Sequence, residues 1–238
     1  MITEINSIKF IYKGEVKLDK VTEDKVQEYW KQLQQETDLL HEGKILIVSE
    51  LIKNEENYII ELKQTSFSYF MYVKEKKVGD IRCMFSGAYI LTSDGYVICV
   101  LNDYYENEMH FKTLNLVGGM ADVGDIVAGD YSSQKCLKRE LKEELGIELD
   151  EQNWNTQLKY LKSPSKSENP VGYPIGTIYE IKTAYTREQL QKLFEKQSHD
   201  KEVNNLVFFS KENYKEIYNY EHKKQYLSEL FEMIFKNA

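Results

Sequence analysis

The segment 118–147 constrains this chain more than any other, because it joins a glycine pair to a helix dense in ionic side chains. Its sequence is GGMADVGDIVAGDYSSQKCLKRELKEELGI. The spacing of Glu140, Glu143 and Glu144 predicts three carboxylates on one helical face. Gly146 is expected to end the helix, whose last turn carries partial negative charge, so glutamates there are unfavourable. A hard divalent cation with oxygen ligands would offset this repulsion.

The charge balance and the cysteine pattern exclude several classes of protein. With 31 basic and 39 acidic residues the net charge is −8, which argues against nucleic-acid binding and favours a small anionic ligand met through a metal. No apolar run approaches the roughly 20 residues of a membrane helix, so no membrane partner is expected. Cys83, Cys99 and Cys136 form no C-x-x-C pair, which predicts neither a disulfide framework nor a zinc knuckle. We expect a cytoplasmic protein with reduced thiols.

The apolar pattern divides the chain into two parts. In the first, it predicts strands at 5–12, 44–52 and 58–64 and a helix at 21–38. The aromatic segment 65–73 fits either a short helix or an irregular cap. The charged segment KEKKVGD, at 74–80, is the best candidate boundary, so we expect an N-terminal module of residues 1–80 and a second domain of residues 81–238.

In the second part, AYILT and YVICV around Asp94-Gly95 predict a β-hairpin. A strand at 111–117 leads to the glycine pair, and Ser132 or Ser133 can cap the helix that follows. The apolar positions of that helix are expected to face inward: Cys136, Leu137, Leu141 and Leu145. Further strands are predicted near 158–163, 175–182 and 206–209, and helices at 187–197 and 221–235.

Strand, glycine pair, loop and carboxylate helix, in this order, resemble the Nudix box of the Nudix hydrolases. That box has glycine, five residues, glutamate, seven residues, and then R-E-U-x-E-E-x-G-U, where U is aliphatic. The segment RELKEELGI, at 139–147, matches its second half at every defined position. In the first half, Asp125 stands where the family has glutamate, and thirteen residues separate Asp125 from Arg139. The loop therefore carries an insertion of about six residues, IVAGDY.

The resemblance implies an α+β fold, a Nudix α/β/α sandwich with a mixed β-sheet, preceded by a small α/β N-terminal module packed on it. It implies a pyrophosphohydrolase that uses Mg²⁺ or Mn²⁺ to cleave the pyrophosphate bond of a nucleoside diphosphate linked to another moiety. The implied metal ligands are Glu140, Glu143, Glu144 and the carbonyl of Gly119. The implied catalytic residues are Arg139, Glu143 and Glu144, with Glu202 in a late acidic loop. No substrate-binding residue is assigned.

The N-terminal part adds a second resemblance. LKQTSFSYF, followed by SGAYILTSDGYVICV and the glycine pair, is similar to the arrangement in the UDP-glucose pyrophosphatase branch of the family. This resemblance favours a nucleotide sugar as the substrate. Because selectivity requires a concave site around the metal helix, the N-terminal module is expected to supply part of the substrate pocket.

Several alternatives stay open at the level of sequence. KRELKEELG taken alone also fits a solvated helix with alternating charges. A Nudix-fold protein that binds a nucleotide as a sensor, with weak or no catalysis, is the alternative function, and a homodimer is a further open point. Asp122 and Asp125 suit turns as well as ligands, and Glu202 suits a surface loop as well as a site. Aromatic residues that could stack on a nucleobase, or belong to the core, are Phe67, Tyr69, Tyr89, Tyr104 and Tyr105.

Overall fold

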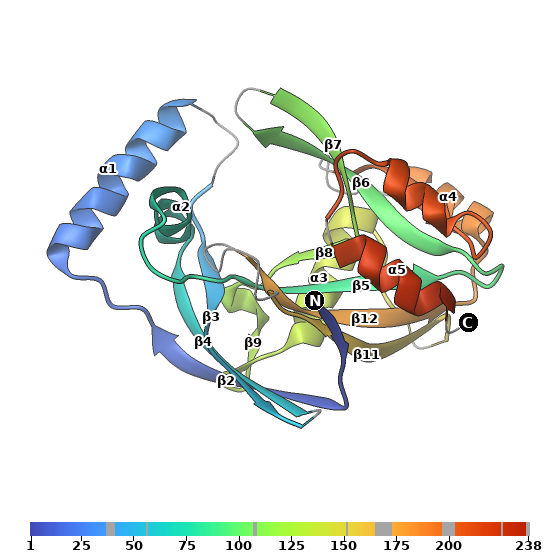
Figure 1. Cartoon of the computed structure of the whole chain (residues 1–238), viewed down its shortest axis with the longest axis horizontal. Helices are drawn as coiled ribbons and strands as arrows, with labels where there is room; N and C mark the ends of the chain where they lie inside the picture. Colours follow the sequence, from blue (N-terminus) through green and yellow to red (C-terminus); the bar gives the residue numbers. More distant parts are fainter. Residues whose placement is uncertain are drawn as a thin grey trace.

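Two main β-sheets and the helices packed against them make up the structure, a computed structural model of the chain (Figure 1). It describes residues 1–36, 41–55, 57–106, 109–150, 152–164, 173–196, 203–224 and 226–236. The expected catalytic residue Glu202 lies outside these ranges. No helix within them is long and apolar enough to cross a lipid bilayer.

The larger sheet has eight strands of mixed direction. In spatial order its main strands are β1 (Ile2–Glu4), β11 (Trp154–Lys162), β12 (Ile175–Thr183), β5 (Met84–Leu91), β6 (Val97–Glu106) and β13 (Val203–Phe209). Two more strands pair with this path, β8 (Val117–Met120) with β5 and β7 (Met109–Asn115) with β6. The pair β12–β5 is parallel, and the other pairs are antiparallel.

Helices cover both faces of this sheet. Successive residues of a strand point to opposite sides, so one strand contributes apolar residues to the core on each face. Ala88 and Ile90 of β5 lie in one apolar cluster with α3 (Ser133–Leu145) and α4 (Arg187–Lys196). Tyr89, between them in sequence, lies in another cluster with α5 (Tyr226–Lys236). The predicted α+β class and its α/β/α sandwich with a mixed sheet are therefore confirmed.

The smaller sheet is built from the N-terminal part of the chain. Its strands, in order, are β2 (Ser7–Glu15), β4 (Asn57–Ser66) and β3 (Lys44–Asn54), with α1 (Lys20–Glu36) and α2 (Phe67–Lys76) beside them (Figure 1). Ser66 caps α2 by accepting a hydrogen bond from the amide of Tyr69 at 3.1 Å. Of the two alternatives for the aromatic segment 65–73, the helix is therefore correct from Phe67 onward.

Backbone hydrogen bonds and a common apolar core join the two sheets. The Leu46 amide donates to the Ala121 carbonyl at 2.9 Å, and the Val48 amide donates to the Arg82 carbonyl at 2.8 Å. Buried residues of both sheets share one cluster, which contains Leu46, Ile60 and Leu62 together with Met84, Ala121, Leu161 and Ile175. The proposed boundary near residue 80 falls between α2 and β5. The division into two domains stays a prediction.

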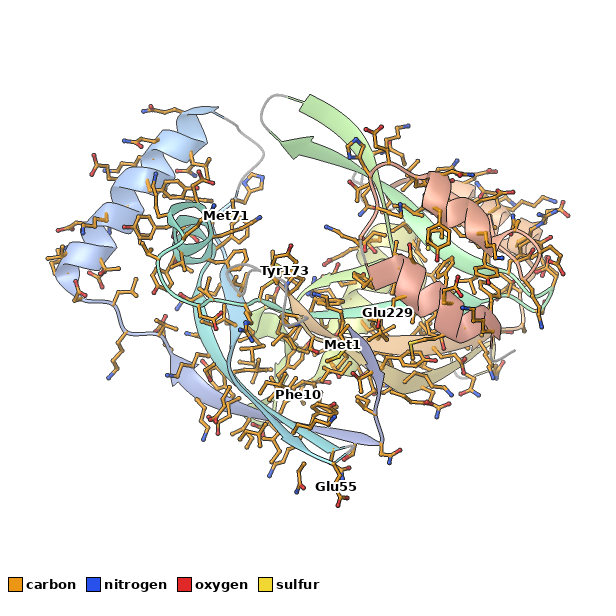
Figure 2. The ribbon with its side chains drawn as sticks, viewed as in Figure 1. Met1, Phe10, Glu55, Met71, Tyr173 and Glu229 are labelled. Carbon is orange, nitrogen blue, oxygen red and sulfur yellow. The ribbon has the colours of Figure 1, made fainter. Side chains whose placement is uncertain are left out.

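The beginning of the chain also belongs to the larger sheet. β1, which was not predicted, pairs with β11. Its Ile2 amide donates to Glu229 of α5 at 3.0 Å, and the Met1 amine lies 3.6 Å from the same carboxylate. Figure 2 labels Met1 and Glu229 at this contact. A three-residue strand gives too short an alternation to be recognised in a sequence.

The inserted segment IVAGDY forms a small hairpin of its own. Its strands are β9 (Ile126–Val127) and β10 (Asp130–Tyr131), which pair with each other. The two turn residues have positive φ, 52° at Ala128 and 94° at Gly129, as expected of a tight hairpin turn.

The inserted hairpin binds to the smaller sheet. The carboxylate of Asp130 accepts a hydrogen bond from the Tyr12 amide at 3.1 Å. The ring of Tyr131 meets that of Phe10, which Figure 2 labels, edge to face with centroids 4.8 Å apart. The inserted hairpin and the N-terminal sheet therefore form one contact surface.

The common core predicts that the two sheets unfold together. Leu46 is fully buried in that core, so Leu46→Ala should lower the free energy of unfolding by about 2–5 kcal/mol. The chain has two tryptophans, Trp30 in α1 and Trp154 in β11. Fluorescence of the Trp30→Phe and Trp154→Phe backgrounds should report the same shifted midpoint in urea. Val21→Ala, at a 63% exposed position, is the control, and separate transitions for the two tryptophans would contradict the common core.

Candidate functional site

The helix that carries the carboxylates, α3, is fixed at both ends by its own sequence. The Ser132 hydroxyl accepts a hydrogen bond from the Lys135 amide at 3.2 Å, and Gly146 ends the helix with φ 66°. Both ends agree with the sequence prediction. The apolar positions expected to face inward are all buried: Cys136, Leu137, Leu141 and Leu145. This burial fixes the rotation of α3 and so the direction of its glutamates.

Arg139 joins α3 to the loop before it and to two glutamates. Its Nε and Nη2 donate to the two oxygens of Asp125 at 3.3 and 3.0 Å. Nη1 donates to Glu140 at 2.6 Å and to Glu143 at 3.0 Å, and Nη2 also donates to the Met120 carbonyl at 2.9 Å. A planar guanidinium can satisfy this many acceptors in fixed directions, which an ammonium cannot.

Asp125, which stands where the Nudix box has glutamate, is a buried anchor for Arg139. Its side chain is 1% exposed, and its Oδ2 accepts a hydrogen bond from the Asp122 amide at 3.1 Å. Asp122 in turn accepts from the Gly124 amide at 2.5 Å, so the two aspartates cap the short 3₁₀ turn η1 (Val123–Asp125). Both aspartates therefore act as turn residues, and Asp125 also orients the arginine.

Glu140 lies almost buried between Arg139 and the backbone of β8. A Cβ at Gly119 would come within 2.5 Å of both carboxylate oxygens, so only glycine lets this carboxylate approach the strand. Burial raises the pKa of Glu140 to about 7, against the attraction of Arg139, and the charges of Glu143 and Asp125 raise it further. An additional positive charge beside Glu140 would therefore be strongly favourable.

Glu144, one helical turn after Glu140, is bound by Gly118, the residue before Gly119 in β8. Its Oε2 accepts a hydrogen bond from the Gly118 amide at 2.7 Å, and its Oε1 accepts from Asn102 Nδ2 at 3.4 Å. The Asn102 Oδ1 is buried and has no hydrogen-bond partner within the described residues. A buried acceptor without a partner is costly, so this oxygen is available to a donor outside the protein chain.

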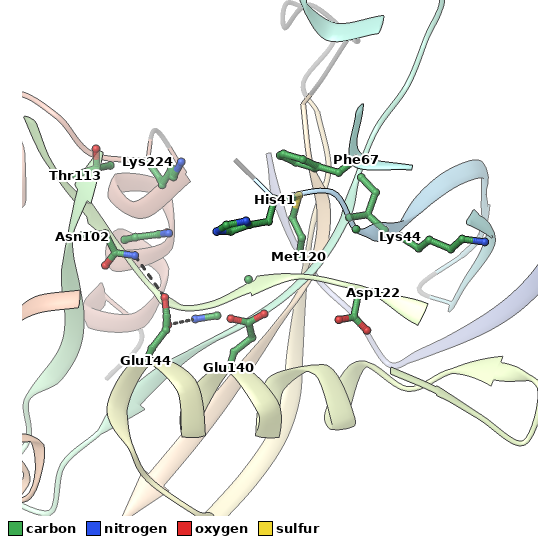
Figure 3. Close-up of a pocket in the computed structure, with 15 residues that line it drawn as sticks. His41, Lys44, Phe67, Asn102, Thr113, Met120, Asp122, Glu140, Glu144 and Lys224 are labelled. Atoms are coloured by element: carbon green, nitrogen blue, oxygen red, sulfur yellow. Dashed lines mark hydrogen bonds between the residues drawn. The ribbon is translucent and has the colours of Figure 1, made fainter. Parts of the chain in front are cut away.

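A cavity of about 590 Å³ opens above these carboxylates. Figure 3 shows Glu140 and Glu144 rising from α3 on one side, with His41 and Phe67 of the N-terminal part on the opposite side. Residues lining the cavity also include Asn102, Thr113, Gly118, Gly119, Asp122 and Lys224. The cavity thus lies between the two sheets and has walls from both.

The structure separates the three glutamates that the sequence places on one helical face. Glu140 and Glu144 line the cavity, whereas Glu143 does not. The Glu143 side chain is 50% exposed and is held by Arg139. The roles implied for Glu143 and for Glu202 remain predictions, since no contact of either with the cavity is described.

The residues of the cavity suit a hard divalent cation. Two buried carboxylates, one of them with a raised pKa, supply the anionic oxygens that Mg²⁺ or Mn²⁺ binds. Within the described ranges no group of three His, Cys, Asp or Glu side chains is gathered closely enough to hold an ion by itself. Mg²⁺ commonly takes one or two carboxylates and completes its coordination with water and substrate phosphates, so the pair of carboxylates fits such an ion.

Sequence reasoning did not find the rest of the cavity wall. His41, Asn102, Thr113 and Lys224 line it but lie far apart in the sequence, and none of them stands in a recognisable pattern. Phe67 was one of several candidate aromatics. Asn102 and Thr113 face each other across the β6–β7 pair of the larger sheet, and the Lys224 amide donates to the Leu114 carbonyl of β7. Packing of the smaller sheet against the larger one brings His41 and Phe67 to the opposite side of the cavity.

The chain has low sequence identity to the known proteins whose structures are similar to it. No protein-family profile and no curated protein matches the chain. Among solved structures it is similar to a NUDIX hydrolase from Nitrosomonas europaea, with 13% identity, 63% of this chain and 86% of that chain covered, and a TM-score of 0.43. It is also similar to the NUDIX domain of Shewanella oneidensis NrtR complexed with ADP ribose, with 11% identity, 73% and 100% covered, and a TM-score of 0.46.

A third similar structure is a bifunctional NMN adenylyltransferase/ADP ribose pyrophosphatase from Francisella tularensis, complexed with AMP and a manganese ion. Its identity to this chain is 13%, with 69% of this chain and 44% of that chain covered and a TM-score of 0.45. Identities and scores at this level do not establish the family of the chain.

The contacts of Arg139 predict that lysine cannot replace it. Arg139→Lys should lower the free energy of unfolding by about 3–5 kcal/mol, because the buried Asp125 loses its forked partner. Arg82→Lys is a matched control, since Arg82 forms the same fork, at 3.0 and 2.9 Å, with the exposed Asp80. The control should change stability by less than about 0.5 kcal/mol. Equal urea midpoints for Arg139→Lys and the wild type would show that the fork is not needed.

Proposed function

We propose that the chain is a Nudix pyrophosphohydrolase that uses Mg²⁺ or Mn²⁺ to hydrolyse the pyrophosphate bond of a nucleoside diphosphate linked to another moiety, with a nucleotide sugar favoured. The observation that carries the proposal is the pair of buried carboxylates, Glu140 and Glu144, on one wall of a large cavity. The RELKEELGI segment that supplies them matches the second half of the Nudix box at every defined position. The ligand is proposed to be a small molecule, without nucleic acid or membrane as partners.

The chemistry requires that negative charge on two phosphates be neutralised while a water molecule attacks one of them. Glu140 and Glu144 would hold the metal, with the carbonyl of Gly119 as a further ligand. When bound, such an ion neutralises phosphate charge and lowers the pKa of the attacking water. Glu144 faces the cavity and is the proposed proton acceptor, with Glu143 and Glu202 as the other proposed acidic groups.

Arg139 is proposed to position the carboxylates. Its Nη1 fixes one oxygen of Glu140, and its fork to Asp125 holds the loop that precedes α3. Because Glu140 is buried next to the backbone of Gly119, it has little freedom to move when charge develops in the cavity. A site arranged before the substrate arrives stabilises the transition state without reorganisation.

The N-terminal module is proposed to complete the substrate pocket. His41 and Phe67 line the cavity opposite the carboxylates (Figure 3). His41 lies just before β3, and Phe67 directly follows β4. β3 is bonded to the segments next to β5 and β8 by backbone hydrogen bonds on both sides of its residue Ile47. A rigid second wall of this kind supports selectivity for a leaving group, which the metal helix alone does not provide.

A nucleotide-binding sensor without turnover is the second candidate function. It is favoured by the position of Glu143, which does not line the cavity, and by the replacement of the family glutamate by Asp125. A binding protein, however, has no need for two desolvated carboxylates and an arginine that orients them. Turnover decides between the two functions.

The proposed hydrolysis predicts strict dependence on a divalent metal and on Glu144. Purified protein should release phosphate, in a phosphatase-coupled assay, from at least one of a panel of nucleotide sugars, dinucleotides, nucleoside triphosphates and CDP-alcohols. Glu144→Gln should lower kcat by about 100-fold or more, and EDTA should abolish turnover. Glu148→Gln, which removes a 75% exposed carboxylate just after the helix, should retain wild-type activity. Tight nucleotide binding without turnover on any member would support the sensor instead.

A further inference from the structure

A second cavity, of about 310 Å³, lies next to the carboxylate site and has no part in the chemistry described so far. The two cavities share Asn115, Gly118, Gly119, Met120 and Lys224 in their walls. A molecule whose phosphates lie beside Glu140 and Glu144 could therefore extend directly into the second cavity. Its walls indicate which part of such a molecule it would accept.

The floor of the second cavity is an aromatic ring lying flat on the larger sheet. Phe85 of β5 packs directly over Gly176 of β12, its register partner, where any Cβ would clash with the ring. Gly87, two residues further along β5, also lines the cavity and adds no side chain beside the ring. Glycine within a strand marks places where a ligand or another chain segment approaches the backbone closely. The half-buried Phe85 ring thus has the backbone of Gly176 below it and the cavity beside it. The ring of Tyr226 is its aromatic neighbour, with centroids 6.3 Å apart and planes at 34°.

The remaining walls are apolar with one fixed polar group. Phe70, Leu116 and Tyr226 contribute apolar surface. Asn115 Oδ1 accepts hydrogen bonds from the Leu116 amide at 2.9 Å and from the Tyr226 hydroxyl at 3.1 Å. Because both hydrogen bonds go to the oxygen, they fix the orientation of the side-chain amide. The Nδ2 of Asn115 makes no hydrogen bond to the described residues. Asn115 thus presents a donor at the junction of the two cavities.

The charged groups of the second cavity are all positive. Lys74 and Lys224 are the ionic residues in its wall, and no carboxylate lines it. Lys74 forms no ion pair within the described ranges of the chain. A flat apolar floor, an oriented amide donor and nearby ammonium groups suit a planar ring with acceptor atoms at its edge, next to phosphate.

We infer that the second cavity binds the nucleobase of the substrate, with Phe85 as the stacking surface. The inference rests on the proposed function only for the identity of the ligand as a nucleotide. The phosphates then lie in the first cavity, and the ribose lies near Asn115, where the cavities meet. Specificity for the base is set by Phe85 and the Asn115 amide, away from the carboxylates of α3.

The other ring near the carboxylates, Phe67, is less suited to stacking on a base. Phe70 stacks on it with centroids 6.2 Å apart and planes at 26°, and Trp30 meets it edge to face at 6.0 Å. Within the described residues Phe67 thus has two ring neighbours, whereas Phe85 has one, Tyr226. Phe67 therefore serves as a wall of the first cavity, and its removal offers a direct comparison with Phe85.

Binding measurements test the inference without any need for turnover. Titration calorimetry with AMP, GMP, CMP and UMP, each compared with ribose 5-phosphate, isolates the contribution of the base. For the wild type we expect at least one nucleotide to bind about 10-fold or more tightly than ribose 5-phosphate, in line with 1–3 kcal/mol for a stacked base. Phe85→Leu should bring the binding ratio, which is the affinity for the nucleotide divided by the affinity for ribose 5-phosphate, close to one. The affinity for ribose 5-phosphate itself should stay within about two-fold of the wild-type value.

Matched variants separate stacking from general damage. Phe10→Leu removes a half-buried ring of the smaller sheet, outside both cavities, and should leave the ratio unchanged, as should Phe67→Leu. Tyr226→Phe keeps the ring but removes the hydroxyl that orients Asn115, so it should lower the ratio and leave the fold intact. It provides a second test if Phe85→Leu does not fold.

Three results would overturn the inference. The first is an unchanged ratio in Phe85→Leu or, if that variant does not fold, in Tyr226→Phe. The second is a loss of the ratio in Phe67→Leu, and the third is a wild type with no preference for any nucleotide over ribose 5-phosphate. Failure of the proposed hydrolysis is a separate result, seen as absence of metal-dependent turnover while the binding ratio still depends on Phe85.

Discussion

The guanidinium of Arg139 is the interaction on which the candidate site depends. It holds the buried Asp125 by a fork, the Met120 carbonyl of β8, and the carboxylates of Glu140 and Glu143. Loop, strand and helix therefore meet at one planar cation. Without it, acidic groups of the loop and helix would face one another at the edge of the core, where desolvation strengthens their repulsion.

The inserted hairpin (residues 126–131) and the N-terminal sheet contact each other. The inserted hairpin brings Tyr131 against Phe10 and Asp130 to the Tyr12 amide. On its other side Tyr131 bonds to Ser86 in the middle of the larger sheet, with 2.7 Å between the hydroxyl oxygens. The insertion thus has a structural role, since the extra residues connect the two sheets.

The two cavities differ in the chemistry of their walls. The first has the carboxylates, walls from both sides of the molecule and the Asn102 oxygen, which has no partner among the described residues, and this suits metal and phosphate. The second has an aromatic floor and positive charges, which suits a ring. The glycines of the central strands make both possible, because Gly119 admits Glu140 and Gly176 admits Phe85.

The sequence by itself determined α3, its caps, its buried face and its carboxylates, because these follow from spacings of three and four residues within one helix. The α+β class was predicted from the resemblance of the segment 118–147 to the Nudix box. Tertiary structure decided that Glu140 and Glu144 face the cavity while Glu143 stays outside, and that Asp125 anchors Arg139. Pairing within the larger sheet brought Asn102, Phe85 and Lys224 to the two cavities, and the packing of the smaller sheet against the larger one brought His41 there. Contacts between residues so far apart in the sequence arise only when the strands pair and the sheets pack.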